Sequence, residues 1–286
     1  MKKTIILLAV SITAILATGC RNSNKGFLID SVKWETVTYE DNVMPSDTSY
    51  GTMSIRFDVD FPVSGLSKNS MALLTSEIIA FCIDETLTDM EPDRAMNVAA
   101  DSLKKDYLET AEDMIASGVL HENMLRWSYE VNASQLRVTG NILTYFAYIS
   151  SYSGGAHGIY SDLYLNVDLK TGQSLSLSNI FVDPSSEKLS SIITAKAVKD
   201  ERTFDDLSIT GNAKVAPSSQ FEITNDGVIF FYEPYQIGSY AAGVIDIKFN
   251  YDELKGFINP DFFEKYNIIA ADPNSTPDAV SSSYVK

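Results

Sequence analysis

The sequence predicts an α+β fold, and two observations carry this prediction. Strand-like alternation and helix-like spacing of apolar residues follow one another along the chain as strands, two helices, strands, one helix and strands again. A doubly wound parallel sheet would instead require strands and helices to alternate regularly. The composition agrees, because 45% hydrophobic and 21% charged residues over 286 positions are typical of one or two folded domains.

The first predicted portion runs strand, strand, helix, helix. Residues 27–40 and 52–61 alternate apolar and polar side chains, as half-buried strands do. Apolar residues spaced three and four apart predict helices over residues 71–81 and 96–114. Gly118 is placed to end the second helix as a left-handed cap.

A second group of strands begins at Trp127. Residues 127–131 and 136–138 predict strands on either side of a turn at residues 132–134. Both alternating sets of residues 142–150 are apolar or aromatic, so we expect a central strand covered on both faces. Residues 163–169 alternate apolar and polar side chains, which predicts a strand with one wet face.

The last predicted portion is a helix followed by strands. Residues 189–197 carry helical spacing, and residues 221–232 predict a hairpin turned at Asn225-Asp226-Gly227. Residues 245–249 predict the final strand. From Ile268 onward the chain is rich in Asp, Pro and Ser without periodicity, so residues 268–286 are predicted to be a disordered tail.

The first twenty residues predict a lipoprotein signal peptide outside the fold. Two lysines precede an uncharged apolar stretch over residues 4–17, and small residues then lead to Cys20. This ending resembles the bacterial lipoprotein cleavage box, in which the cysteine thiol receives a diacylglycerol and palmitate-type acyl chains anchor the protein. We expect a signal peptide at 1–19 and a lipidated tether at 20–26; an uncleaved N-terminal anchor is the alternative.

The tether also predicts where the anchored protein lies. It lacks the acidic run after the cysteine that resembles a surface-export signal in some Gram-negative lipoproteins. We therefore expect a cell-envelope protein on the outer membrane that faces the periplasm.

Charge and rare residue types exclude several function classes. The 38 acidic against 22 basic residues give a net charge of −16, which argues against nucleic acid or an anionic lipid surface as a partner. Two histidines and two cysteines argue against zinc sites and a disulfide framework, so no metal or cofactor is expected. Cys82 follows a helical pattern and is interpreted as a buried core residue.

A run of acidic residues stands out between residues 84 and 113. Ten acidic and three basic residues give it a local charge of −7. Such a face could steer a basic protein such as a lysozyme, whereas a solvated helix surface explains the same count without a partner.

Four segments in the second half carry a family resemblance. They are residues 152–158, 171–181, 221–231 and 233–243. Their order resembles the RsiV-like C-terminal domain family (DUF3298), and the portion before them resembles the DUF4163-like domain that precedes it. The resemblance covers residues 145–258 and implies a small strand-helix-helix-strand domain at 27–144, followed by a mixed-sheet domain at 145–267.

The resemblance implies a binding function. RsiV relatives sense lysozyme by binding it, and deacetylase relatives take their catalysis from a separate domain whose metal motifs this sequence lacks. We therefore expect a lipid-anchored, non-catalytic envelope protein that recognises a lysozyme-like protein or a cell-wall glycan such as peptidoglycan. An envelope hydrolase acting on glycan or peptide is the alternative, and a purely structural lipoprotein is a third reading.

Tyr152, His157, Tyr235 and Tyr240 are the candidate ligand-binding residues. His157 lies in a glycine-rich turn, where it either faces a ligand or fastens the turn by hydrogen bonds. Tyr235 and Tyr240 either form a recognition surface, because tyrosine offers a large contact area with little entropy loss, or pack inward and fix a bend. His157 lacks partners at metal-ligand spacing and no Gly-x-Ser-x-Gly occurs, so no catalytic or metal-ligating residue is assigned.

Overall fold

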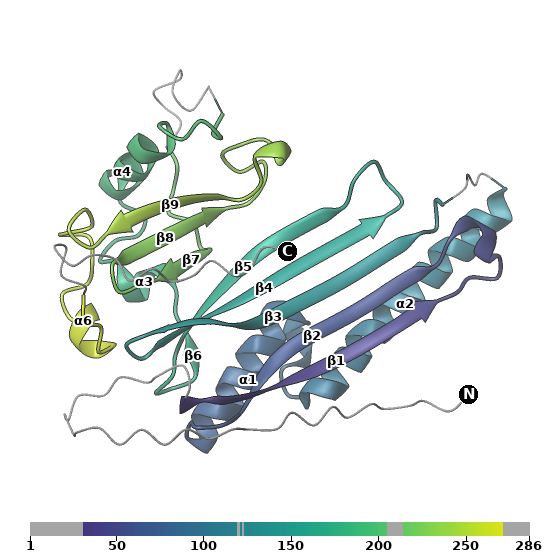
Figure 1. The fold of residues 1–286 in the computed structure, drawn as a ribbon, viewed down its shortest axis with the longest axis horizontal. Helices are drawn as coiled ribbons and strands as arrows, with labels where there is room; N and C mark the ends of the chain where they lie inside the picture. The colour runs from purple at the N-terminus through teal and green to yellow at the C-terminus, as the bar shows by residue number, and fades with distance from the viewer. Residues whose placement is uncertain (1–30, 119–120, 122, 205–213, 271–286) are drawn as a thin grey trace, which may run out of the picture.

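The computed structural model describes residues 31–118, 121, 123–204 and 214–270, and it confirms the α+β prediction (Figure 1). The described residues form a six-stranded sheet, a three-stranded sheet and helices that cover them. In spatial order the first sheet contains β1 (Lys33–Val43), β2 (Met53–Ser64), β3 (Trp127–Thr139), β4 (Ile142–Ser153), β5 (Ile159–Asp168) and β6 (Gln173–Ser174). The second sheet contains β7 (Phe221–Ile223), β8 (Gly227–Tyr232) and β9 (Ile245–Asn250).

The helices are longer in the first half of the chain than in the second. They are α1 (Lys68–Cys82), α2 (Pro92–Ser117), α3 (Leu177–Ile180), α4 (Glu187–Ala197) and α6 (Phe262–Lys265), with short 3-10 turns η2 (Thr48–Tyr50), η3 (Glu85–Leu87) and η4 (Tyr240–Ala242). None of the described helices is both long enough and apolar enough to span a membrane.

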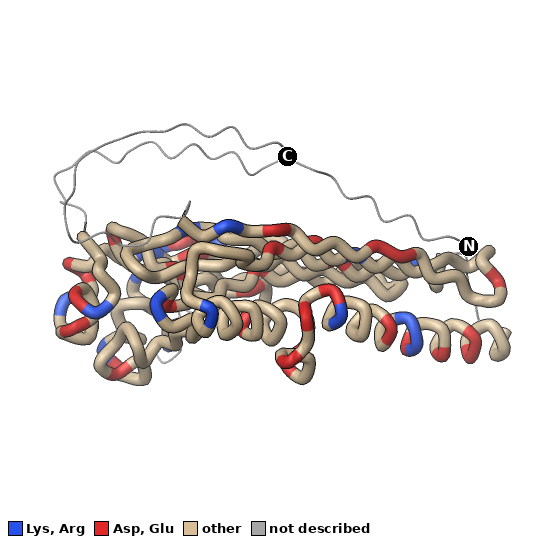
Figure 2. The backbone as a smooth tube through the Cα atoms, turned by 90° about the horizontal axis from the view of Figure 1, so that it is seen from below, with Lys and Arg blue, Asp and Glu red and all other residues tan. Residues whose placement is uncertain are grey.

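The first sheet is mixed, because β2 and β3 run parallel while the other neighbours are antiparallel. The connection between these two strands contains α1 and α2, which lie along one side of the sheet (Figures 1 and 2). Alternate side chains of β2 are buried against this side: Met53, Ile55, Phe57, Val59 and Phe61. Burying this apolar row is the main reason that the strands and helices associate.

The second sheet has its own hydrophobic core and packs across one end of the first sheet. Its core joins residues of β7, β8 and β9 with α4 and α6, including Phe230, Ile193 and Phe262. At the junction, Tyr164 of β5 stacks on Phe231 of β8, with ring centroids 3.8 Å apart and planes 4° apart. Tyr164 lies on the face of the first sheet that points away from α1 and α2. The second sheet covers only one end of this face (Figure 1).

Several sequence predictions are confirmed by these elements. The two first-half helices, the helix at 189–197, the hairpin and the last strand all form. Gly118 ends α2 in the left-handed region at φ 68°, as expected of a helix cap. β4 is an interior strand, although cover on both faces holds only to Ala147, since the side chains from Tyr148 onward are mostly half-exposed.

The predicted turn at residues 132–134 is wrong. β3 continues from Trp127 to Thr139 and pairs with β2 on one side and β4 on the other. The register shifts between Gln135 and Arg137, so a bulge accommodates the irregular stretch. Two paired neighbours satisfy the backbone better than a turn would, which overrides the local turn preference of Asn and Ser.

The predicted wet face of β5 is wrong in part. Asn166 is 1% exposed, and its side chain accepts a hydrogen bond from the Thr144 hydroxyl at 2.9 Å and donates one to the Phe221 carbonyl at 2.7 Å. The second sheet covers this end of β5 through polar contacts. Alternating polarity therefore marks a hydrogen-bonded interface here and not water.

The predicted domain boundary between residues 144 and 145 falls inside β4, within a sheet that continues on both sides of it. The division into domains stays a prediction. The signal peptide, Cys20, the tether and most of the predicted tail lie outside the described residues.

Candidate functional site

Three of the four predicted site residues lie together where the second sheet's loop meets the end of the β4–β5 hairpin. The rings of His157 and Tyr240 have centroids 4.5 Å apart, and those of Tyr235 and Tyr240 are 5.8 Å apart. The Tyr240 hydroxyl donates to the Gly158 carbonyl at 3.0 Å, and His157 Nδ1 lies 2.9 Å from the same oxygen. These contacts join the glycine-rich turn to the Tyr235 segment, two regions about eighty residues apart in sequence.

Tyr152 is placed differently. Its hydroxyl donates to the Gly155 carbonyl at 2.9 Å, which fastens the glycine-rich turn from within. Among the described residues it makes no ring contact with the other three. A role in ligand binding stays a prediction for all four residues, and Tyr152 has the clearest structural role.

Tyr235 is held at the surface in an unfavourable backbone conformation. Its side chain is 63% exposed and its φ is 73°, in the left-handed region that bulky residues rarely adopt. Its amide donates to the Gly238 carbonyl at 2.9 Å, which closes the turn. The left-handed conformation costs about 1–2 kcal/mol for a residue with a side chain, so the loop presents this ring despite a local cost.

The aromatic cluster continues onto the first sheet, which the sequence reasoning missed. Tyr160 of β5 lies 5.9 Å from Tyr240 and 6.1 Å from Tyr148 of β4, measured between ring centroids. We call Tyr148, Tyr160, Tyr240 and Tyr235 the tyrosine row. The sequence pattern does not mark Tyr148 as exposed, because both alternating sets of residues in its strand are apolar or aromatic. In the structure, all four tyrosines of the row are at least partly exposed.

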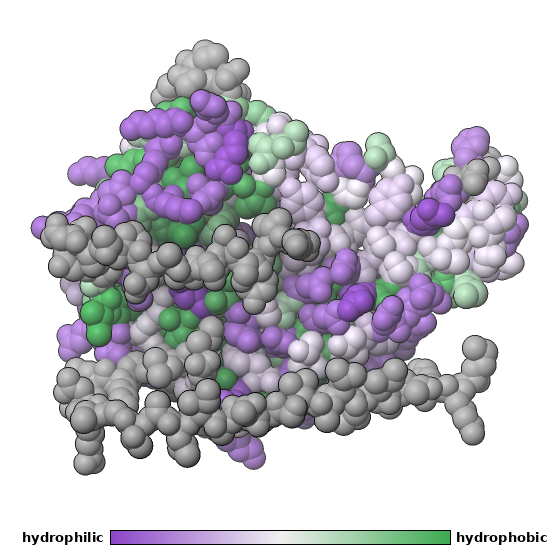
Figure 3. Space-filling model, in the orientation of Figure 1, coloured by the Kyte–Doolittle hydropathy of each residue, from purple (hydrophilic) through white to green (hydrophobic). Residues whose placement is uncertain are grey.

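The tyrosine row borders an acidic sheet face. The strand register places a set of polar residues on the face of the first sheet opposite the buried row of β2, and we call the following nine of them the open face: Thr36, Thr38, Glu40, Arg56, Asp58, Asp60, Glu130, Asn132 and Asp162. Arg56 forms an ion pair with Asp58 at 2.6 Å, and Glu40 and Glu130 also lie close enough to raise the pKa of its guanidinium. Five carboxylates against one guanidinium leave the face negative. Figure 3 views this side, which is largely white to purple where grey residues leave it visible.

At the border with the second sheet, Asp162 of the open face meets one further carboxylate, that of Glu233. The Glu233 carboxylate accepts a hydrogen bond from the Asp162 amide at 3.0 Å. Burial raises the pKa of both carboxyl groups, and the nearby negative charge of Asp162 further raises that of Glu233. Both side chains are half-buried.

Three observations describe the metal-ligand, thiol and pocket chemistry of the described residues. The described residues contain no group of three or more His, Cys, Asp or Glu side chains that could hold a metal ion. Burial raises the pKa of Cys82 to about 12, and its Sγ donates to the Ile78 carbonyl, so this thiol is not poised as a nucleophile. A hollow of about 380 Å³ beside Tyr232 and Gln236 is lined without any histidine or carboxylate.

Comparisons with known proteins place the fold. Residues 178–252 match the family model DUF3298, described as a protein of unknown function, which confirms the predicted DUF3298 resemblance over a shorter range than 145–258. A DUF3298 family member from Bacteroides fragilis NCTC 9343 is similar in structure, with a TM-score of 0.74 and 22% identity over 85% of this chain and 98% of that one. A DUF3298 family protein from Pseudomonas aeruginosa PAO1 gives a TM-score of 0.55 and 16% identity over 81% and 96%. No curated protein matches the chain.

The matched residues divide the candidate site. Tyr235 and Tyr240 lie inside the range 178–252, whereas His157 and the first-sheet tyrosines lie before it. At these levels of identity the solved structures show the fold alone.

Proposed function

We propose that this chain, whose residues 178–252 form a DUF3298 domain, is a lipid-anchored, non-catalytic binding protein of the bacterial cell envelope. In this proposal it is RsiV-like, with a DUF4163-like portion before the domain, and Cys20 carries the lipid on the periplasm-facing side of the outer membrane. The observation that supports binding is the tyrosine row, together with His157, at the edge of the part of the polar sheet face that no described helix or strand covers.

Tyrosine rings suit this role for physical reasons. Each ring offers a large apolar surface and a polar hydroxyl, and it loses little side-chain entropy when a ligand covers it. Binding energy at interfaces concentrates in such residues. The backbone of Tyr235 is the strongest argument for a binding role. A glycine could adopt the φ of 73° without the conformational cost, so the turn alone does not require a tyrosine.

The negative charge of the open face favours a basic protein ligand over a neutral ligand. A negative face attracts a basic protein such as a lysozyme and orients its approach. Cell-wall glycan is the second candidate, because exposed rings in a row can stack on the apolar faces of successive sugars.

Titration of the purified full-length chain in detergent, with a lysozyme and separately with soluble peptidoglycan fragments, tests this function. Binding of lysozyme should weaken as salt rises, because ions screen the attraction between exposed charges, whereas glycan binding should change little. Tyr235→Ala should weaken binding of the true ligand by about 30-fold, since an interface aromatic anchor contributes about 2 kcal/mol.

Met44→Ala is the matched control, because Met44 is 67% exposed on the loop after β1 and lies outside the tyrosine row. It should leave the affinity unchanged. Absence of binding to either ligand at low salt would reject the proposed function. Release of sugars or peptides from peptidoglycan by the purified chain would reject its non-catalytic part.

A further inference from the structure

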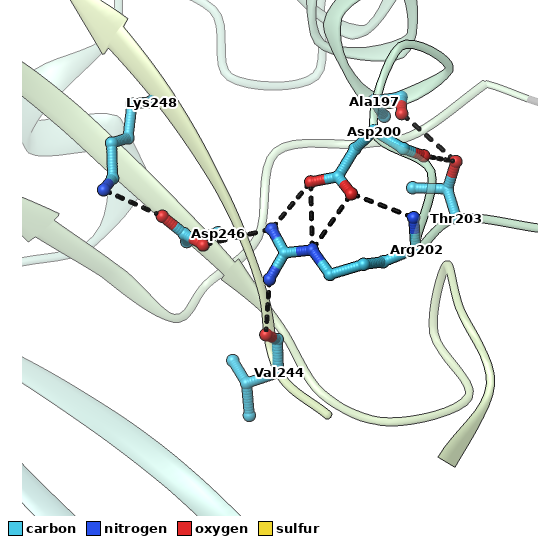
Figure 4. Close-up of polar contacts among 7 residues, drawn as sticks. All are labelled: Ala197, Asp200, Arg202, Thr203, Val244, Asp246 and Lys248. Carbon is cyan, nitrogen blue, oxygen red and sulfur yellow. Dashed lines mark hydrogen bonds and ion pairs between the residues drawn. The ribbon is translucent and has the colours of Figure 1, made fainter. Parts of the chain in front are cut away.

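Four carboxylates meet near the junction of the two sheets, and they fall into two classes. Glu222 forms an ion pair with Arg137, and Asp246 pairs with Arg202 at 3.3 Å and Lys248 at 3.0 Å. Figure 4 shows Asp246 held between those two cations. No lysine or arginine of the described residues forms an ion pair with either Asp162 or Glu233, so these two half-buried acids have no cationic partner there.

The negative charge of Glu233 is not needed for its contact with the Asp162 amide. On the outer edge of β5, the Tyr164 amide donates to the neutral side-chain oxygen of Gln220 at 2.7 Å. Two residues earlier on the same edge, the Asp162 amide donates to Glu233 at 3.0 Å. A glutamine oxygen could accept that backbone hydrogen bond and would avoid the cost of a second carboxylate beside Asp162. The Ser161 side chain also forms a hydrogen bond with the Glu233 carboxylate, and this second contact, like the first, favours the charged form.

Aromatic rings surround the two carboxylates. Asp162 lies opposite Tyr148 in the β4–β5 register, and Tyr160 is its neighbour on the same face of β5. Burial raises the pKa of the Tyr160 hydroxyl, and Asp162 and Glu233 lie close enough for their charges to raise it further. The ring of Tyr240 lies 5.9 Å from that of Tyr160 and bounds the site on the side of the second sheet.

We propose that Asp162 and Glu233, with the rings of Tyr148, Tyr160 and Tyr240, receive a lysine or arginine side chain of a basic protein ligand. Carboxylates form charge-assisted hydrogen bonds with such a group, and aromatic rings attract a cation through their faces. The occupant is assigned by charge complementarity, because the adjoining open face is itself negative. The proposal rests on the proposed function, since it names the group of the ligand that anchors at the tyrosine row.

A lysine-rich peptide and the same peptide with every lysine acetylated are the probes, titrated into the full-length chain. The double variant Asp162→Asn/Glu233→Gln should weaken binding of the charged peptide by about tenfold, equivalent to about 1.4 kcal/mol. Its control, Asp106→Asn/Asp113→Asn, also removes two charges, from exposed positions of α2 on the other side of the sheet. The control should change the affinity by less than about twofold, and the acetylated peptide should not bind.

Substitutions at Tyr160 test the ring itself. Tyr160→Phe keeps the aromatic face and should keep the affinity for the charged peptide, whereas Tyr160→Leu should lose several-fold. Each carboxylate variant is also made singly, and its thermal unfolding confirms that it is folded before its affinity is compared.

Equal losses in the site and control double variants would overturn the proposal, because the attraction would then be diffuse. Binding of the acetylated peptide would overturn it as well, and so would a site variant that loses glycan binding but not peptide binding. None of these outcomes touches the proposed function, which is tested by Tyr235→Ala against lysozyme and peptidoglycan.

Discussion

Tyr235 and Asp162 are two residues at which this protein departs from local preference. Tyr235 occupies a left-handed backbone conformation, and Asp162 keeps a carboxyl half-buried with no cationic partner among the described residues. Both lie beside the same row of rings. Unfavourable local choices persist where function requires them, which is why the two departures together mark the site better than either alone.

Replacing Asp162 by asparagine should stabilise the chain at neutral pH. Burial raises the pKa of Asp162 in the folded state above its unfolded value, so the folded chain binds this proton more tightly. Wild-type stability from this group is therefore present at acid pH and is lost as pH rises through the folded-state pKa. Asp162→Asn should gain about 0.5 kcal/mol at pH 7, a small value because water screens a half-exposed carboxyl.

Urea unfolding of both proteins at pH 7 and at about pH 3 measures this difference. The gain should vanish at the lower pH, where the wild-type carboxyl is protonated in both states. A variant that is less stable than wild type at pH 7 would show that the charge of Asp162 stabilises the fold. In that case the Asp162 carboxylate would have a stabilising structural partner.

At the scale of elements, the sequence predicts which side chains of a helix or strand are buried better than it predicts which neighbouring element those side chains contact. α1 and α2 follow from apolar spacing, and Gly118 ends α2 as expected. The polar side chains of β5 predicted a face exposed to solvent, but Asn166 and Tyr164 on this face instead contact the second sheet. Polarity alternation reports which side chains avoid the apolar core, and it cannot distinguish solvent from a hydrogen-bonded neighbour.

The candidate site divides in the same way. The motif resemblance singled out His157, Tyr235 and Tyr240, and the structure brings these three side chains together. Glu233 lies within a recognised segment, yet its contact with Asp162 spans 71 residues and depends on how the two sheets meet. Such long-range contacts leave no periodic pattern in a single sequence.

The ion pair between Arg137 of β3 and Glu222 of β7 should be important for joining the two sheets. Glu222 is 5% exposed, so Arg137→Met would leave a nearly buried carboxylate without its partner. We expect a loss of about 3 kcal/mol in unfolding free energy. The double variant Arg137→Met/Glu222→Gln should recover most of this loss, because no charge is then left unpaired.

Chemical unfolding of the two single variants, the double variant and wild type gives the coupling energy of this pair. Lys105→Met is the control, since Lys105 forms an exposed 3.8 Å pair with Glu109 and should change stability by less than about 0.5 kcal/mol. If Arg137→Met proved as mild as the control, water would be reaching Glu222 and the sheets would be joined mainly by their apolar and stacking contacts.

At the scale of the whole molecule, negative charge lies on both sides of the first sheet. Six of the ten acidic residues between 84 and 113 lie on α2 and the other four directly precede it, whereas the open face lies on the opposite side of the sheet (Figure 2). Several α2 acids have local partners, including Asp101 with Lys104 and Glu112 with the Ser46 amide and hydroxyl. In our proposal a basic ligand would therefore be attracted from two sides, and the rings beside Asp162 and Glu233 would supply the specificity that net charge cannot.

We propose that Cys20 determines where the candidate binding surface is displayed. If its thiol carries acyl chains, each buried methylene contributes about 0.8 kcal/mol to membrane attachment, and a diacylated and N-acylated cysteine holds the protein firmly. Cys20→Ser should therefore abolish palmitate labelling and move the chain from the membrane fraction to the soluble or unprocessed pool. Cys82→Ser is the matched control, because Cys82 is buried among core residues and should leave labelling unchanged. Palmitate labelling that survives Cys20→Ser would contradict lipidation at Cys20, and a chain that stays in the membrane fraction without labelling would favour the uncleaved anchor.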